Sequence, residues 1–130
     1  MPLSNEKSST LFVLLPAKAA KWIAKGGTWQ PTTMDIDGLE ANLRQVSSLR
    51  AENWPMHIAI DRPEQYFRQY VAIIRKGRKL IYVNAFCGDF PESDWRQQLV
   101  LIADGGSCCW QALYDPVKKE FSTLRINGVA

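Results

Sequence analysis

Residues 66–87 have the sequence YFRQYVAIIRKGRKLIYVNAFC, and this stretch decides the fold of the chain. Two runs rich in β-branched and aromatic residues flank Lys76-Gly77, and a two-residue turn that contains glycine is typical of a tight β-hairpin. If the turn is that tight, Arg75 pairs with Arg78, and the two runs pair residue by residue to the ends of the stretch.

Both faces of this hairpin carry large apolar or aromatic side chains, because alternate residues of a strand point to opposite faces of a sheet. One face holds Phe67, Val71, Ile73, Leu80, Tyr82 and Phe86. The other face holds Tyr66, Tyr70, Ile74, Ile81 and Val83. Each face of the predicted sheet therefore needs a cover.

A second hairpin is predicted further along the chain, from Gln98–Asp104 to Ser107–Tyr114. Gly105-Gly106 supplies its two-residue turn. In that hairpin Leu101 lies opposite Trp110, which adds a further apolar row to the sheet.

Three shorter elements complete the predicted domain. The last strand, Phe121–Ile126, follows a turn that Asp115-Pro116 favours. Near the start, Leu11–Leu15 is apolar enough for a short strand, and Pro16–Lys25 is typical of a short surface helix. Residues 1–10 are polar and terminal, so we expect them to be loosely structured.

One amphipathic helix is predicted from Ile36 to about Leu49. The residues from Asp37 to Glu40 have the form of a capping box, with Asp37 as the cap. The apolar residues recur every three or four positions and form one stripe, made of Ile36, Leu39, Leu43, Val46 and Leu49. Such a helix packs on the sheet through one side only.

The predicted architecture is a single α+β domain over residues 1–130, with one main helix on a bent antiparallel meander of four to five strands. A helix of about 13 residues is about 20 Å long and covers only one face of such a sheet. The second face needs another cover. The candidates are the N-terminal segment with Trp22 and Trp29, a second copy of the chain or another protein, and a small ligand.

This order of elements resembles the cystatin-like and NTF2-like α+β folds, in which a bent sheet wraps a helix. The last third of the chain also resembles a group of short uncharacterised bacterial proteins, through DGGSCCW at 104–110, YDP at 114–116, Phe121, Leu124 and Asn127-Gly128. Relatives with cystatin-like folds include protease inhibitors, small-molecule-binding domains, enzymes and toxin-neutralising proteins. The resemblance rests on turn and core residues, so it implies a fold and does not select a function.

The three cysteines are predicted to be free. In an up-and-down meander Cys87 lies at the far end of its strand from Cys108 and Cys109, about 20 Å away at a rise of about 3.3 Å per residue. A disulfide needs Cα atoms within about 7 Å of each other. Free thiols suit a reducing compartment, and we expect a cytoplasmic protein.

The composition excludes some classes of partner. The chain has 130 residues, of which 46% are hydrophobic and 22% are charged, as in ordinary globular domains. A net charge of +3 is too small to indicate a nucleic-acid partner. The apolar run 11–15 is far shorter than the roughly 20 residues of a membrane span, so we expect no membrane partner.

No catalytic, cofactor or metal pattern stands out in the sequence. The single histidine, His57, would have to meet a cysteine in space to activate it, and we expect the cysteines to be buried packing. The carboxylates Asp89, Glu92 and Asp94 lack the spacing of a calcium loop. We therefore expect a protein that is not an enzyme, with no catalytic residues, no metal and no cofactor.

The predicted function is binding of a protein partner, either a toxin or enzyme that the domain neutralises or a second copy of the chain. Aromatic and arginine side chains dominate binding energy at protein interfaces. The predicted partner-binding residues are Tyr66, Arg68, Tyr70, Tyr82 and Trp110 on the sheet, and Arg75, Lys76, Arg78 and Lys79 at the basic tip of the first hairpin. The alternative is an NTF2-like pocket for a small ligand or a reaction, lined by Tyr82, Asn84, Trp110 and Cys109.

Overall fold

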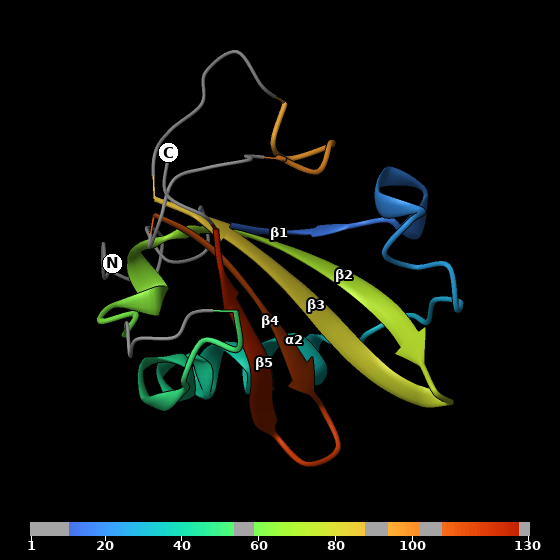
Figure 1. The fold of residues 1–130 in the computed structure, drawn as a ribbon. Coiled ribbons are helices and arrows are strands. Elements are labelled where there is room, and N and C mark those ends of the chain that lie inside the picture. Colours follow the sequence, from blue (N-terminus) through green and yellow to red (C-terminus); the bar gives the residue numbers. More distant parts are fainter. Residues whose placement is uncertain (1–10, 54–58, 88–93, 102–107, 128–130) are drawn as a thin grey trace, which may run out of the picture.

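The computed structural model describes residues 11–53, 59–87, 94–101 and 108–127, which form one five-stranded sheet with helices against it (Figure 1). The strands are β1 (Phe12–Leu15), β2 (Phe67–Arg75), β3 (Arg78–Phe86), β4 (Cys109–Asp115) and β5 (Glu120–Ile126), and their order in the sheet is β1-β2-β3-β4-β5. Only β1 runs parallel to its neighbour, and the other pairs are antiparallel. The predicted α+β architecture is confirmed, with one parallel edge strand added to the meander.

The first hairpin forms as the sequence predicts. Arg75 pairs with Arg78, and the pairing continues without a break to Phe67 opposite Phe86. Lys76 and Gly77 both have positive φ, at 54° and 76°. Two consecutive positive φ angles are what a type I′ turn requires, and that turn matches the natural twist of the two strands.

The predicted second hairpin is wrong. Residues 99–101 are not a strand, and β4 pairs directly with β3, so that Trp110 lies opposite Ala85 rather than Leu101. The turn at Gly105-Gly106 lies outside the described residues. The long β3 offers β4 a complete antiparallel partner, and local turn signals cannot reveal such a pairing between distant segments.

The main helix begins earlier than predicted and has two parts. The α-helix α2 spans Thr33–Ala41, and the 3₁₀ helix η2 (Leu43–Ser48) follows it. The capping box is made by Thr32 and Asp35, not by Asp37 and Glu40: the Asp35 amide donates to the Thr32 hydroxyl at 3.2 Å, and the Thr32 amide donates back to the Asp35 carboxylate at 2.8 Å.

The side of the sheet that faces α2 and η2 is called the helix face. Its buried side chains include Tyr70, Ile81, Val83, Ala85, Trp110, Ala112 and Tyr114. The predicted apolar stripe packs against them, with Leu39, Leu43 and Val46 buried and Ile36 and Leu49 half-buried. Figure 1 shows α2 behind β4 and β5, so the opposite side of the sheet, called the outer face, is turned toward the reader.

The N-terminal segment covers only part of the outer face. Ala20, which ends the 3₁₀ helix η1 (Ala17–Ala20), and Ile23 pack against Val71, Ile73, Leu80 and Leu113. Trp22 is 60% exposed and is not part of this cover. Trp29 packs with the helix-face cluster, and its indole N–H donates to the carbonyl oxygens of Ile73 and Leu80, both at 3.0 Å.

The edge of β5 that faces away from β4 is hydrogen-bonded by side-chain and backbone groups from the segment after α2. The Gln45 side chain accepts from the Phe121 amide, and the Glu52 amide donates to the Leu124 carbonyl. The Asn53 side chain donates to the carbonyl of Ile126 and accepts from its amide. The backbone of β5 is therefore hydrogen-bonded on both sides of the strand.

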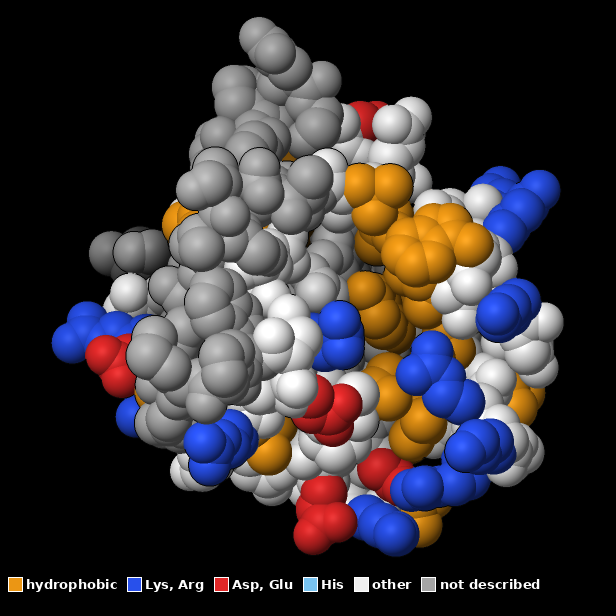
Figure 2. All heavy atoms as spheres, in the orientation of Figure 1, with side chains coloured by type: hydrophobic (Ala, Val, Ile, Leu, Met, Phe, Trp, Pro, Cys, Tyr) orange, Lys and Arg blue, Asp and Glu red, His pale blue; other side chains and the backbone are white. Residues whose placement is uncertain are grey.

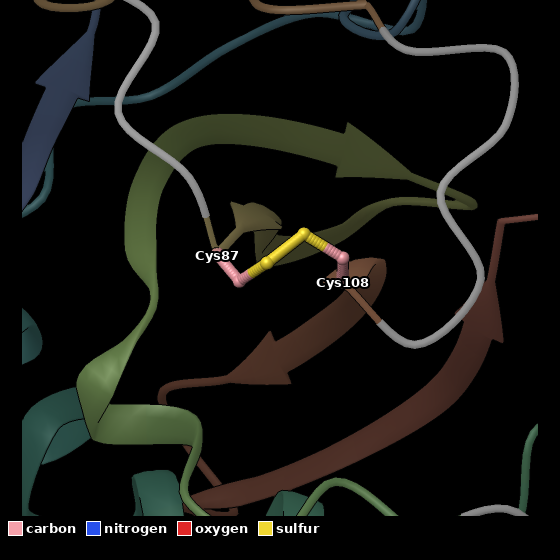
Figure 3. Close-up of a disulfide and its surroundings, with 2 residues drawn as sticks. All are labelled: Cys87 and Cys108. Atoms are coloured by element: carbon pink, nitrogen blue, oxygen red, sulfur yellow. A yellow bond between two sulfur atoms is a disulfide. The ribbon is translucent and has the colours of Figure 1, made fainter.

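The prediction of three free thiols is wrong. Cys87 and Cys108 form a disulfide, with Cα atoms 5.0 Å apart (Figure 3). The reason is the pairing of β3 with β4: Phe86 lies opposite Cys109, which brings Cys87 next to Cys108, and the Cys87 amide donates to the Cys108 carbonyl at 2.8 Å. Cys109 remains a free and buried thiol. The disulfide removes the thiol argument for a reducing compartment.

None of the helices that the structure describes is long and apolar enough to span a membrane.

Candidate functional site

Three of the predicted partner-binding residues lie inside the protein. Arg68, Tyr70 and Trp110 are each 0% exposed and belong to the helix face. Because a partner contacts only accessible atoms, these three side chains do not form a docking surface in this structure. Their burial follows from α2 and η2, which pack against this face of the sheet.

Arg68 and Tyr70 instead belong to a buried polar cluster with Glu40 of α2. The Arg68 guanidinium donates to the Glu40 carboxylate at 3.0 Å and to the Tyr70 hydroxyl at 2.8 Å, and the Tyr70 hydroxyl donates to the same carboxylate. Arg68 also donates to the carbonyl oxygens of Glu64, in the 3₁₀ helix η3 (Pro63–Gln65), and of Tyr66. Burial raises the pKa of Tyr70 well above its usual value. This cluster joins α2 and η3 to the sheet.

Trp110 packs edge-to-face against Tyr66, with ring centroids 5.7 Å apart. Tyr66 is half-buried, and burial raises the pKa of its hydroxyl. Both rings lie on the helix-face side, so Trp110 does not line a pocket together with Tyr82 and Asn84, which lie on the outer face.

The predicted basic tip is exposed, and the structure enlarges it. Arg78 forms an ion pair with Asp115, which places the turn between β4 and β5 beside the turn between β2 and β3. The Asp115 carboxylate also accepts from the amides of Val117 and Lys118. We call this region the basic end; its exposed cations are Arg75, Lys76, Arg78, Lys79, Lys118 and Lys119. Figure 2 shows Lys and Arg side chains gathered at the lower right of the molecule.

The electrostatics of the basic end hold Asp115 ionised. Burial raises the pKa of this carboxyl, but hydrogen bonds from Lys118, Arg78 and Val117 and the charge of Arg78 outweigh burial, so the pKa is lowered below its usual value. Sequence analysis missed Lys118 and Lys119 here, because only the pairing of β3 with β4 brings the two turns together.

A groove of about 310 Å³ opens on the outer face, at the end of the sheet opposite the basic end. Its polar lining consists of Asn53, Tyr82, Asn84, Gln111, Arg125 and Asn127. Its apolar lining includes Trp22, Phe86, Leu99, Val100, Leu101 and Cys109. Figure 2 shows a hollow in the middle of this face with hydrophobic side chains beside it. The volume is at the lower end of the range of about 300–1,000 Å³ for small-molecule sites.

A row of amide side chains crosses the sheet at this place, and all of its members except the fully buried Gln69 line the floor of the groove. Gln69 lies opposite Asn84, and Asn84 lies opposite Gln111, so the three side chains are neighbours on one face. Asn84 donates to Gln69 at 2.9 Å, and Gln111 donates to Asn84 at 3.2 Å and to Asn127 at 3.0 Å. We call Gln69, Asn84, Gln111 and Asn127 the amide row.

The same amides hold one wall of the groove in place. Gln69 donates to the carbonyl oxygens of Trp95 and Gln98, both at 2.6 Å, and accepts from the Val100 amide at 2.9 Å. Asn84 donates to the Val100 carbonyl at 2.8 Å. The 94–101 segment therefore lies over the sheet through side-chain amides instead of a strand ladder, which is why its apolar residues 99–101 form a wall and not a strand.

Tyr82 is a titratable group in the lining of the groove, and two arginines act on it. Burial raises the pKa of its hydroxyl to about 12, while the charges of Arg75 and Arg125 act in the opposite direction. The hydroxyl is therefore protonated at neutral pH and can donate a hydrogen bond. Burial also raises the pKa of the Cys109 thiol, so this thiol is not an activated nucleophile.

The structure brings together Tyr82, Asn84 and Cys109, three of the four residues predicted to line a pocket, and it places the fourth, Trp110, on the other face. Sequence analysis missed Gln111 and Arg125. Alternation along β4 and β5 puts these two side chains on one face, but only the pairing of Asn84 with Gln111 brings them to the predicted pocket residues, and the wrong second hairpin excluded that pairing.

Two other predicted features lie partly or wholly outside the described residues. These are His57 and the carboxylates Asp89 and Glu92; Asp94 is described and exposed. Among the residues that the structure describes, no three histidine, cysteine or acidic side chains are placed to hold a metal ion.

Comparison of the chain with protein-family models, with curated proteins and with solved structures gives no significant match to any of them.

Proposed function

We propose that this protein is a non-enzymatic binding protein whose outer-face groove holds a small organic molecule. The observation that carries the proposal is the amide row beneath an apolar rim. Ligand sites typically combine apolar walls with a few fixed polar groups, and the groove has this composition. Asn84 is only 6% exposed, and its hydrogen bonds to Gln69 and to the Val100 carbonyl fix its position in the floor.

The rim adds a second argument. The described chain exposes four large hydrophobic side chains, Trp22, Met34, Leu101 and Val117. Two of them, Trp22 and Leu101, lie at this groove. Exposed apolar side chains that flank a concave site favour contact with the apolar part of a ligand.

The chemistry of the lining favours binding over catalysis. The part of the lining that the structure describes contains no carboxylate and no imidazole, which are the usual general acids and bases. The thiol of Cys109 and the hydroxyl of Tyr82 both have raised pKa values, so neither is activated at neutral pH. The groove offers hydrogen bonds and apolar contact.

A fluorescent apolar probe tests the proposal. N-phenyl-1-naphthylamine brightens in apolar sites, and we expect it to bind the protein and to lose about fivefold to tenfold in affinity in the double variant Trp22→Ala, Leu101→Ser. The control is Met34→Ser, Val117→Ser, which removes the two other large exposed apolar side chains of the described residues, both outside the groove. Equal loss of affinity in both double variants, or no loss in the first, would overturn the proposal.

The basic end supports a second candidate function, binding of an acidic protein such as a toxin or enzyme that the domain neutralises. Six cations lie there, against two carboxylates: Asp115, which is already paired with Arg78, and the exposed Glu120 opposite it in the sheet. Salt-sensitive binding of a polyglutamate peptide, lost in Lys76→Glu, Lys118→Glu, would support this candidate. Tighter binding of a DNA duplex than of the peptide would contradict it.

A second copy of the chain is the competing cover for the outer face. Light scattering during size-exclusion chromatography distinguishes a small ligand from a second copy, because a dimer that dissociates in Trp22→Ala, Leu101→Ser would assign the groove to self-association.

We also propose that the sheet and α2 represent a cystatin-like or NTF2-like fold with an added parallel edge strand. The support is one main helix on one face of a mostly antiparallel meander.

A further inference from the structure

The positive charge at one side of the groove points to the chemistry of its ligand. Arg125 lies opposite Gln111 in the pairing of β4 with β5, so its side chain starts at the end of the amide row. It is exposed, and none of the described carboxylates forms an ion pair with it. An exposed guanidinium without an internal counter-ion is available to an external anion.

A second cation, Arg75 at the basic end, also acts electrostatically on Tyr82. The charges of both Arg75 and Arg125 lower the pKa of Tyr82 against the effect of burial, which places both guanidinium groups within electrostatic reach of one phenol. No ion pair of Arg75 is formed within the described part of the chain either. Arg125 and the protonated hydroxyl of Tyr82 both line the groove, so its edge carries a charged donor and a neutral donor, and Arg75 adds positive charge from the basic end.

The side chains of Asn84 and Gln111 cannot be the groups that hold an anion. Asn84 uses both N–H bonds of its amide, toward Gln69 and the Val100 carbonyl. Gln111 also uses both, toward Asn84 and Asn127. Within the described residues the Gln111 carbonyl oxygen accepts no hydrogen bond, so Gln111 can still accept one. This carbonyl oxygen would repel an anionic group of a ligand and would favour a neutral group that donates a hydrogen bond.

We propose that the groove binds a small amphipathic organic acid, with its anionic oxygens on Arg125 and Tyr82 and its flat apolar body between Trp22 and Leu101. A guanidinium presents two parallel N–H donors that match a carboxylate, and a neutral phenol adds a third donor. The apolar body then lies against the wall that Leu99 contributes. This inference rests on the proposed function of the groove and names its ligand class.

Competition between matched ligands tests the ligand class. The displaced probe is N-phenyl-1-naphthylamine, and the competitors are 1-naphthoate and 1-naphthalenemethanol, which share the ring system and differ in charge. We expect naphthoate to displace the probe at about tenfold lower concentration than the alcohol at low salt, and this ratio to fall as NaCl is added.

Arg125→Gln should bring the ratio of the two competitors close to one, because it weakens the binding of naphthoate far more than that of the neutral alcohol. Arg125→Lys should retain part of the preference, because lysine keeps the charge without the paired donors. Arg44→Gln is the matched control, since Arg44 is an exposed arginine that does not line the groove. Thermal unfolding of each variant confirms that it is folded.

The outcomes separate this inference from the proposal on which it rests. A ratio near one in the unchanged protein, or a ratio that Arg125→Gln does not alter, overturns the organic-acid assignment. The groove proposal survives that outcome if Trp22→Ala, Leu101→Ser still weakens the neutral probe, and it fails with the assignment if that variant binds the probe normally.

Discussion

The two faces of the sheet are made by the same strands, but they differ in how deeply their side chains are buried and in how their polar groups are bonded. On the helix face, side chains such as Ile81, Val83 and Trp110 are fully buried beneath α2 and η2. On the outer face, apolar side chains are covered near η1, while the amide row lies at the floor of an open groove. The alternation of a β-strand therefore lets nine-residue strands such as β3 provide a dry core on one side and a polar site on the other.

The difference also lies in how polar groups are used. On the helix face the polar cluster of Arg68, Tyr70 and Glu40 is closed, because its members bond to one another and to backbone carbonyls. On the outer face Arg125 and Tyr82 keep their donors available. A closed cluster fixes the fold, whereas open donors can recognise a ligand, and the following predictions test this distinction in order of expected effect.

Glu40→Ala should have the largest effect, lowering the free energy of unfolding by about 3–5 kcal/mol, because it leaves the fully buried Arg68 without its carboxylate. Urea unfolding monitored by tryptophan fluorescence measures the change. Glu52→Gln is the matched control, since the exposed Glu52 contributes its backbone amide and not its carboxylate to the β5 edge. A loss below about 1 kcal/mol would show that the cluster does not anchor α2.

Leu39→Ala should lower the free energy of unfolding by about 3 kcal/mol, because the side chain of Leu39, in α2, is completely buried against the helix face. Leu101→Ala makes the same chemical change on the groove rim, where the side chain is 70% exposed, and should cost less than about 0.5 kcal/mol. Denaturant midpoints of the two variants compare the faces directly. Similar losses in both would contradict the division between core and site.

Removal of the disulfide should cost about 3 kcal/mol, because the bond between Cys87 and Cys108 closes a loop at a sequence separation of 21 residues. The double variant Cys87→Ser, Cys108→Ser measures this loss by urea unfolding. Dithiothreitol should bring the unchanged protein to the stability of the double variant and leave the variant itself unaffected. If the reductant destabilised both proteins equally, the bond would not be the cause.

High pH should destabilise the protein, partly through Tyr82. Its pKa is about 12 in the folded protein and close to 10.0 when unfolded, so between these values the folded state holds a proton that the unfolded state has lost. The stability that this group contributes is complete below pH 10 and decreases as pH rises toward 12, by at most about 3 kcal/mol. Tyr66, Tyr70 and Tyr114 also have raised pKa values and contribute in the same direction.

Comparison with Tyr82→Phe isolates the contribution of this one tyrosine. The variant should lose less stability than the unchanged protein between pH 9 and pH 11.5, as measured by urea unfolding at each pH. Parallel curves for the two proteins would mean that Tyr82 titrates alike in the folded and unfolded states.

The first hairpin was predictable to the residue because all of its information is local. Lys76-Gly77 specifies the turn, and the turn specifies every pair from Arg75 and Arg78 outward. The same logic failed at residues 98–114, where Gly105-Gly106 gave an equally good local signal. There the decisive partner is β3, which is distant in sequence, and no turn residue encodes that pairing.

The missed pairing of β4 with β3 explains both the wrong prediction of free cysteines and the residues missed at the groove. Once β4 pairs with β3, Cys108 lies beside Cys87, and Gln111 lies between Asn84 and Arg125. The helix start was missed for a different reason. Thr32 and Asp37 are both good N-caps, and only the position of α2 on the sheet shows which of them is used.

The occupied outer edge of β5 has a consequence for how molecules of this protein can associate. A β-sheet grows from molecule to molecule only by adding a strand to an edge whose amides and carbonyls are free. At β5, Gln45, Glu52 and Asn53 already bond to that edge, so a neighbouring chain would have to displace them before it could dock. The opposite edge is β1, which offers only four residues. Continuation of the sheet into a filament is therefore blocked at one end and weakly supported at the other.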